Sequence, residues 1–225
     1  MIFTTKALSP FGQPEFEIQL NQHEFAQVDF DFLQNALVQM AKSGARFLNG
    51  QLIQIGSTPC RVASGRGTLF LEEPDFEMYP LHWIPGATNT MRHLRIQNYV
   101  GDSLGLRDSL SHPSVLQSAV ICTQLTPASG IFMERTSPTD SEDSGWNILC
   151  PDPKHAHDNP ATLRRELLYL VCMVNSAVPQ YIALPEKISI LQHFKGIPHF
   201  SLNGEPIPFA RDSYLAQRYV SIRPR

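Results

Sequence analysis

The sequence predicts an α+β protein with a mixed or mainly antiparallel sheet, a few helices and two closely packed modules. Hydrophobic residues make up 42% of the 225 residues and include 13 Phe, so the chain can bury a sizeable core. Short apolar runs alternate with Gly and with 18 Pro, which is typical of short strands joined by turns. Two longer segments carry apolar residues at helical spacing instead.

In the first half of the chain we expect a strand, a helix and a meander. Residues 15–20 alternate strictly between polar and apolar side chains, which predicts a half-buried strand. Asp29 offers an N-cap to a helix over residues 30–42, and Gly44 is a natural stop for that helix. Gly and Pro separate the strands of the meander, which are predicted at residues 51–55, 60–63 and 67–71.

A second helix is predicted over residues 88–104, with apolar residues spread around it. Residues 163–174 have helical spacing but are almost continuously apolar from 167, so periodicity alone does not decide between a helix and a buried strand. We favour a helix at the start of this segment. Asn203-Gly204 between short apolar pieces marks a hairpin turn. The strands of the second half are predicted at residues 118–122, 130–133 and 146–149.

The composition changes around residues 106–113, which predicts a boundary between two modules. The first would be an α+β module of residues 1–112, and the second an α+β module of residues 113–225. Both are short, so we expect each to need the other's surface to bury enough apolar area.

Charge and hydropathy exclude several classes of function. The net charge is −3 and the pI is near 6.2, so no global basic field recruits nucleic acid or an anionic membrane. The N-terminus has no sustained apolar run typical of a signal peptide. No run approaches the roughly 20 apolar residues that span a bilayer. We therefore expect a cytoplasmic protein without nucleic-acid or membrane partners.

Four cysteines lie far apart in the sequence and form no C-x-x-C pair, so neither a disulfide framework nor a zinc knuckle is predicted. Each lies in or beside an apolar run, where a free thiol behaves as a small hydrophobic residue. His155 and His157 could share a metal, because residues two apart point the same way in an extended segment. Without a third ligand at a recognisable spacing, the sequence predicts no metal site and no cofactor.

An acidic, serine-rich segment runs from residue 134 into Gly145-Trp146 and a short apolar strand. This order of strand, acidic loop, Gly-Trp and strand resembles polymorphic-toxin immunity family thirty-three, a domain of bacterial toxin–antitoxin neighbourhoods. The apolar run 167–174 and the segment 178–185 resemble the later half of that family. The resemblance covers about residues 115–200 and leaves the N-terminal module outside it.

The resemblance implies an immunity protein that binds one cognate toxin and turns over no substrate. Carboxylates beside an aromatic anchor suit a basic patch on a partner, where they speed encounter and fix register. A solvated loop and a Trp in the core are the alternative interpretations. Which module contacts the toxin and the oligomeric state stay open. The predicted partner-binding residues are Asp140, Glu142, Asp143, Trp146 and Asp152.

Two other classes of function compete with immunity. A small hydrolase or transferase could use the carboxylates of residues 72–77, or the loop that carries His155 and His157, for acid–base chemistry. A surface turn explains these carboxylates more simply, and no nucleophile motif is present, so the sequence predicts a protein that is not an enzyme. The third class is a non-enzymatic adaptor. Trp83 fits either a core strand between prolines or an exposed recognition aromatic.

Overall fold

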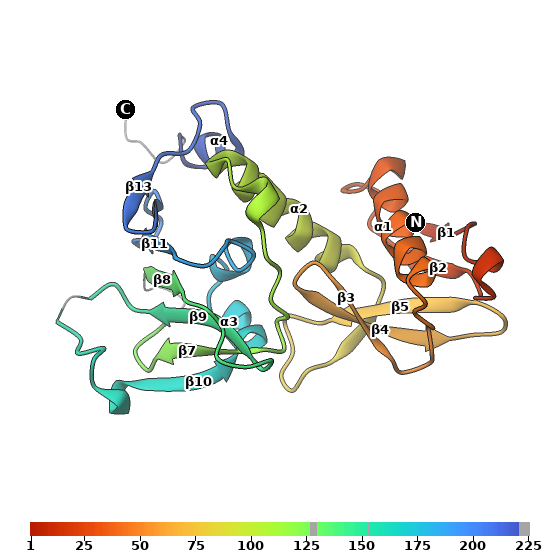
Figure 1. The fold of residues 1–225 in the computed structure, drawn as a ribbon, viewed down its shortest axis with the longest axis horizontal. Helices are drawn as coiled ribbons and strands as arrows, with labels where there is room; N and C mark the ends of the chain where they lie inside the picture. Colours follow the sequence, from red (N-terminus) through yellow and green to blue (C-terminus); the bar gives the residue numbers. More distant parts are fainter. Residues whose placement is uncertain (127–129, 153, 221–225) are drawn as a thin grey trace. The chain divides into compact units, whose positions relative to one another are not determined.

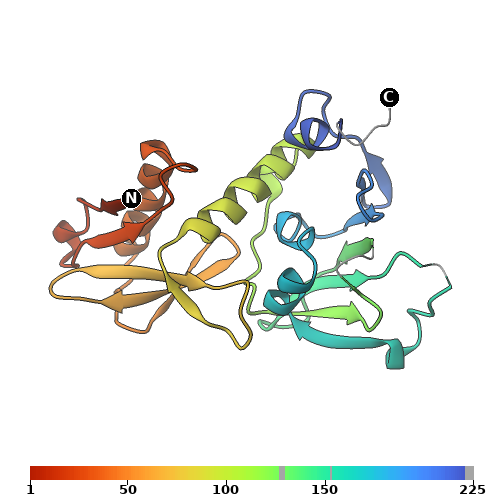
Figure 2. The same ribbon diagram turned by 180° about the vertical axis from the view of Figure 1, so that it is seen from behind.

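The computed structural model describes residues 1–126, 130–152 and 154–220, and confirms the predicted α+β class (Figures 1 and 2). It contains two mixed sheets, each in its own compact unit, Met1–Arg92 and His93–Arg225. The division falls inside helix α2 (Thr88–Leu104), ahead of the boundary at residues 112/113 that the composition indicates. No helix in the described part of the chain is both long enough and apolar enough to cross a bilayer.

The first sheet has the strand order β1-β2-β5-β4-β3, and β6 pairs with the far end of β5. Strands β2 and β5 are parallel, and every other pair in this sheet is antiparallel. The predicted strand at 15–20 and the meander are thereby confirmed. The bounds are β1 Ile2–Thr4, β2 Phe16–Gln19, β3 Leu52–Ile55, β4 Thr58–Ser64, β5 Leu69–Pro74 and β6 Trp83–Pro85.

Helix α1 (Gln27–Lys42) begins earlier than the predicted residue 30, because its cap differs from the prediction. Ala26 occupies the N-cap position, and its backbone N–H donates to the Asp29 carboxylate at 2.9 Å. Asp29 therefore closes the first turn from inside the helix, as the acid of a capping box does. The buried face of α1 joins the core of the first unit through Phe30, whose ring stacks on Phe3 at 4.7 Å.

The second sheet has the order β10-β7-β9-β8-β11-β12-β13. Strands β7 and β9 are parallel, and the other neighbours are antiparallel. The predicted hairpin turn at Asn203-Gly204 joins β12 to β13. The bounds are β7 Ser118–Cys122, β8 Ile131–Arg135, β9 Asp143–Leu149, β10 Leu163–Leu167, β11 Ile188–Gln192, β12 His199–Leu202 and β13 Glu205–Ile207.

The prediction for residues 163–174 was wrong in its order. The start of this segment is the edge strand β10, and the helix α3 (Leu168–Val174) follows it. Residues Leu163–Leu167 pair antiparallel with Ser118–Cys122, so a long-range ladder overrides the local helical spacing. The chain of the second unit ends, within the described residues, in helix α4 (Tyr214–Val220). Short 3₁₀ turns occur at Ser9–Phe11, Arg107–Ser109, Pro160–Thr162 and Val178–Gln180.

Gly145 has a backbone conformation and a close contact that both require glycine. Its φ is +75°, and a Cβ at this position would overlap the carbonyl oxygen of Thr136, the residue after β8. The Thr136 N–H donates to the Gly145 carbonyl at 2.9 Å, so the two backbones cannot separate without loss of this bond. The glycine therefore fixes where the acidic loop joins β9.

We predict that Gly145→Ala lowers the free energy of unfolding by more than Gly204→Ala. Gly204 has a φ of +83° with nothing within 4 Å of a Cβ, so it is a control for the strain of a left-handed backbone, about 1–2 kcal/mol. The overlap with Thr136 should add about 1–3 kcal/mol at Gly145. Urea denaturation of both variants measures the difference, and equal losses would contradict the role assigned to the close contact.

Candidate functional site

The acidic loop connects β8 to β9, and one of its acids is buried and serves the loop itself. The Asp143 carboxylate accepts hydrogen bonds from Thr139 N and Thr139 Oγ1, both at 2.9 Å, and from Gly145 N at 3.0 Å. Burial raises the pKa of Asp143, but these hydrogen bonds outweigh it and hold the pKa below its ordinary value. Asp143 therefore stabilises the conformation of the loop, and its burial keeps it from contact with a partner.

The other predicted acids are exposed. Asp140 and Glu142 lie at the tip of the loop, and the Asp140 carboxylate accepts a hydrogen bond from the Glu142 N–H at 2.8 Å. Asp152 follows β9, is exposed, and accepts a hydrogen bond from the Lys154 N–H at 2.9 Å. These three carboxylates can meet a positively charged surface without any rearrangement of the fold.

Trp146 lies in the core of the second unit and exposes 1% of its surface. Its indole N–H donates to the Ile182 carbonyl at 2.9 Å, and the Arg135 guanidinium lies 5.7 Å from the centre of its ring. Arg135 is buried as well and donates to the carbonyls of Ser111 and Leu184 at 2.9 and 2.6 Å. Burial lowers the pKa of Arg135. The structure therefore supports the interpretation of Trp146 as a core residue.

A cluster of four side chains forms at the opposite end of β9. Cys122 ends β7, Cys150 follows β9, and His155 and His157 come from the next loop. Nδ1 of His155 lies 3.1 Å from Sγ of Cys122 and 3.3 Å from Sγ of Cys150. Nε2 of His157 lies 3.4 Å from Sγ of Cys150 and 3.1 Å from Nδ1 of His155. All four atoms lie within 4.8 Å of one another.

Sequence reasoning weighed His155 and His157 as metal ligands but predicted no metal site, because it did not place the two cysteines beside them. Cys122 belongs to a strand far from the histidines in the sequence, and only the pairing of β7 with β9 brings it near. Burial raises the pKa of the Cys150 thiol, and a hydrogen bond from the backbone N–H of Asp152 opposes that rise. The prediction that the cysteines are small core residues fits their burial, but it does not account for the position of Cys122 and Cys150 beside two imidazoles.

Two of the four carboxylates of residues 72–77 are engaged in structural contacts of the first unit. Glu72 pairs with Arg61 at 2.6 Å, and the Arg61 guanidinium also lies 5.3 Å from the ring centre of the half-buried Trp83. Glu73 is buried and accepts hydrogen bonds from the N–H groups of Asn89 and Thr90, at 2.9 and 2.7 Å. It thus supplies acceptors for the free N–H groups at the start of α2.

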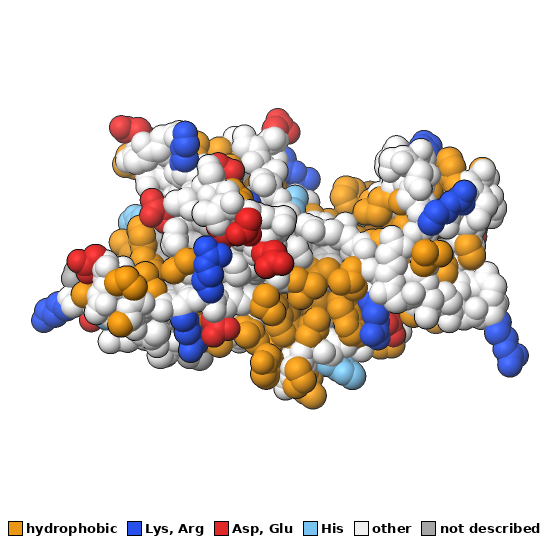
Figure 3. Space-filling view, turned by 60° about the horizontal axis from the view of Figure 1, so that its bottom comes forward, with side chains coloured by type: hydrophobic (Ala, Val, Ile, Leu, Met, Phe, Trp, Pro, Cys, Tyr) orange, Lys and Arg blue, Asp and Glu red, His pale blue; other side chains and the backbone are white. Residues whose placement is uncertain are grey.

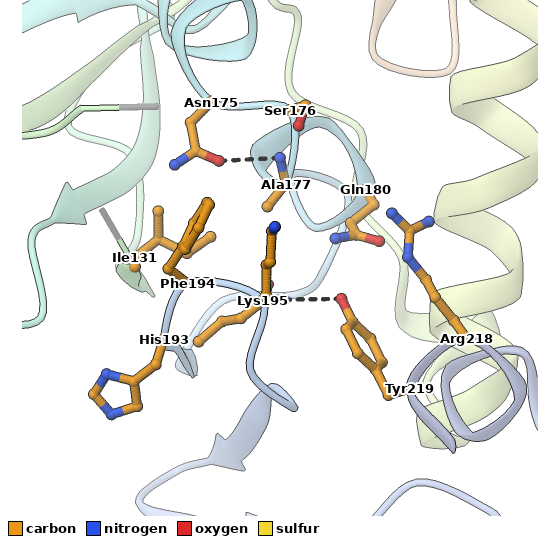
Figure 4. A pocket seen from close by; sticks show the side chains of 12 residues that line it. Ile131, Asn175, Ser176, Ala177, Gln180, His193, Phe194, Lys195, Arg218 and Tyr219 are labelled. Carbon is orange, nitrogen blue, oxygen red and sulfur yellow. Dashed lines mark hydrogen bonds between the residues drawn. The ribbon is translucent and has the colours of Figure 1, made fainter. Parts of the chain in front are cut away.

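The second unit also holds a cavity of about 470 Å³ (Figure 4). The cationic side chains of Lys195 and Arg218 line it, together with the amide of Gln180. That amide is buried, and neither its nitrogen nor its oxygen has a hydrogen-bond partner among the described residues. None of the described residues that line the cavity is Asp or Glu, and it reaches neither His155 nor His157. It therefore offers no carboxylate for acid–base chemistry.

Comparison of this chain with protein-family models, with curated proteins and with solved structures gave no match. The fold therefore defines only a broad structural class, an α+β protein with two mixed sheets.

We predict that Glu73→Gln changes how stability depends on pH. Burial raises the pKa of Glu73 above 4.5 by more than its hydrogen bonds lower it, so the folded protein holds this proton more tightly than the unfolded chain. The contribution of Glu73 to the free energy of unfolding therefore falls as pH rises from about 4.5 through the raised pKa, and is constant above it. Glutamine is neutral throughout.

Urea denaturation at a series of pH values, for wild type and Glu73→Gln, measures this effect. Relative to the variant, the wild type should lose stability across that window. Parallel curves for the two proteins would contradict the raised pKa of Glu73.

Proposed function

We propose that this protein is an immunity protein that binds a cognate bacterial toxin and neutralises it by direct contact. The observation that carries the proposal is the motif of strand, acidic loop, Gly145-Trp146 and strand, which resembles polymorphic-toxin immunity family thirty-three. Its expected site of action is the cytoplasm, where such a protein would meet a toxin that enters or is made in the cell. The proposal requires a protein–protein contact and no turnover.

Within the motif, buried residues anchor the loop and exposed residues carry the charge, and this arrangement supports the proposal. Asp143 is held by three hydrogen bonds, and Trp146 is packed against Arg135, so both anchor the loop. The exposed carboxylates of Asp140 and Glu142 are then presented from a loop that is already folded. A preorganised loop loses little conformational entropy on binding, and its charges can steer a basic partner toward it.

A second surface with the character of an interface lies in the first unit, on the connection between β5 and β6. Met78 and Tyr79 in this connection are 50% and 70% exposed, so two large apolar side chains that are neighbours in the sequence lie at the surface. A contiguous exposed apolar patch can mark a contact surface. The connection lies at the lower edge of Figure 1, and Figure 3, which brings that edge forward, shows hydrophobic side chains gathered there. Tyrosine is enriched among residues that dominate binding energies, so this surface is the alternative place for the contact.

Catalysis is the competing proposal, and the contacts of two of its candidate carboxylates argue against it. Glu72 is paired with Arg61, and Glu73 accepts hydrogen bonds at the start of α2. A general base needs an acceptor directed at a substrate, whereas these acceptors are directed at the protein's own groups.

We predict that co-expression with the product of the neighbouring toxin gene yields a stable complex. The buried interface should reach at least about 1,000 Å², because smaller contacts rarely give a stable and specific pair. Size-exclusion chromatography with light scattering measures the complex, and a growth assay measures protection. Protection without a detectable complex would indicate enzymatic detoxification and overturn the proposal.

We predict that the double charge reversal Asp140→Lys and Glu142→Lys slows association with the toxin by about tenfold or more at low salt. Exposed charges act mainly on the association rate, and salt screens them, so the effect should shrink as ionic strength rises. Stability should change by no more than about 0.5 kcal/mol per site, since both acids are exposed. Stopped-flow or surface-based kinetics give the rates.

The matched control is the double variant Asp108→Lys and Glu205→Lys, which reverses two other exposed acids of the same unit. It changes the net charge by the same amount, so a larger effect at Asp140 and Glu142 reports their position. Equal rates for both double variants would remove the acidic loop from the interface and direct attention to Tyr79 in the β5–β6 connection.

A further inference from the structure

The four side chains at the carboxyl ends of β7 and β9 have the composition and spacing of a metal site. Zinc binds cysteine sulfur at about 2.3 Å and histidine nitrogen at about 2.0–2.1 Å, and a tetrahedral ion with these bonds separates its ligand atoms by about 3.3–3.8 Å. The four separations given above for Cys122, Cys150, His155 and His157 are 3.1–3.4 Å. These four separations are therefore within a few tenths of an ångström of those that a single ion requires, and the other two are no longer than 4.8 Å.

The fold itself brings these ligands together. Because β7 and β9 are parallel neighbours with Ile121 opposite Ile148, Cys122 and Cys150 emerge at the same edge of the sheet. The loop then turns back through hydrogen bonds from the His155 N–H to the Asp152 carbonyl, at 3.2 Å, and from the Thr162 hydroxyl to the Ala156 carbonyl, at 2.8 Å. This turn places both imidazoles over the two sulfurs.

A backbone group beside one of the sulfurs supplies a second observation that points to a metal. The Gln124 N–H donates to Sγ of Cys122 at 3.2 Å. The donor lies two residues after its cysteine. Outer hydrogen bonds of this kind orient ligands and support the charge of a metal-bound thiolate.

We propose that Cys122, Cys150, His155 and His157 bind one zinc ion in a closed, structural site. Two thiolates and two imidazoles in a tetrahedral arrangement favour zinc among the common divalent ions. Four protein ligands leave no position for a reactive water, so the ion has a structural role and catalyses no reaction. It ties the loop after β9 to the edge of the second sheet. The site is independent of toxin binding, and either proposal can fail without the other.

The test is the metal content and the ligand environment of the whole chain, purified under reducing conditions without a metal-affinity tag. Elemental analysis should find about one zinc per chain, as expected for one four-ligand site. After removal of the ion with a chelator, Co²⁺ should restore it with the intense visible absorption of a tetrahedral site and a charge-transfer band from thiolate. Zinc should also raise the melting temperature of the chelated protein.

Matched variants assign the ligands. Cys150→Ala and His157→Ala should each lose zinc affinity by about 100-fold or more in a competition assay with a chromophoric chelator. Cys172→Ala, which removes a buried thiol outside the cluster, and His199→Ala, which removes an exposed imidazole, should keep the wild-type zinc content. If a ligand variant fails to fold, the Co²⁺ spectrum of the wild type still decides the question.

Several results would overturn the zinc site. One is a wild-type chain that holds less than about a tenth of an equivalent of zinc and gives no thiolate band with Co²⁺. Another is a folded Cys150→Ala or His157→Ala variant that retains wild-type zinc affinity. A third is a disulfide between Cys122 and Cys150 in freshly prepared protein, detected by non-reducing mass spectrometry.

Discussion

The parallel pairing of β7 with β9 is the constraint on which the second unit depends most. The chain leaves β7, forms β8 two positions away and returns as β9 between the two. Because the pair is parallel, the amino ends of both strands meet at one edge of the sheet and their carboxyl ends at the other. At the first edge, the Ser118 N–H donates to the Glu142 carbonyl at 2.7 Å and anchors the acidic loop. At the second edge, the same pairing places Cys122 beside Cys150.

Buried polar groups give this fold its specific geometry. Asp143, Arg135 and Glu73 are all removed from water, and each is matched by hydrogen bonds from or to the backbone. A buried charge without such partners is costly, so these three groups penalise any arrangement of the chain that breaks their contacts. Arg135 shows this well, because it links β8 to the carbonyls of Ser111 and Leu184 and packs against Trp146. The nearby acids Asp140 and Glu142 are exposed, so their carboxylates can face a partner.

The proposed zinc site and the proposed toxin contact both involve a loop at one edge of the second sheet. Each loop has side chains that contact the sheet, and each carries exposed charge. The acidic loop is held by Asp143 and presents Asp140 and Glu142. The loop after β9 brings His155 and His157 to Cys122 and Cys150, and it also carries the exposed Asp152. A loop that its own hydrogen bonds hold in one conformation, as those of Asp143 hold the acidic loop, suits recognition because less entropy is lost on binding.

The sequence by itself determined the fold class, most strands and the approximate extent of α1 and α2. It could do so because the periodicity of apolar residues and the Gly and Pro residues that separate elements are local signals, which extend over a few residues. It also singled out the acidic loop, and it weighed both histidines as metal ligands but predicted no metal site. Tertiary structure decided the rest, because pairing between distant strands leaves no local signal. Such pairing made residues 163–167 a strand, buried Trp146 and Asp143, and brought Cys122 and Cys150 to the two histidines.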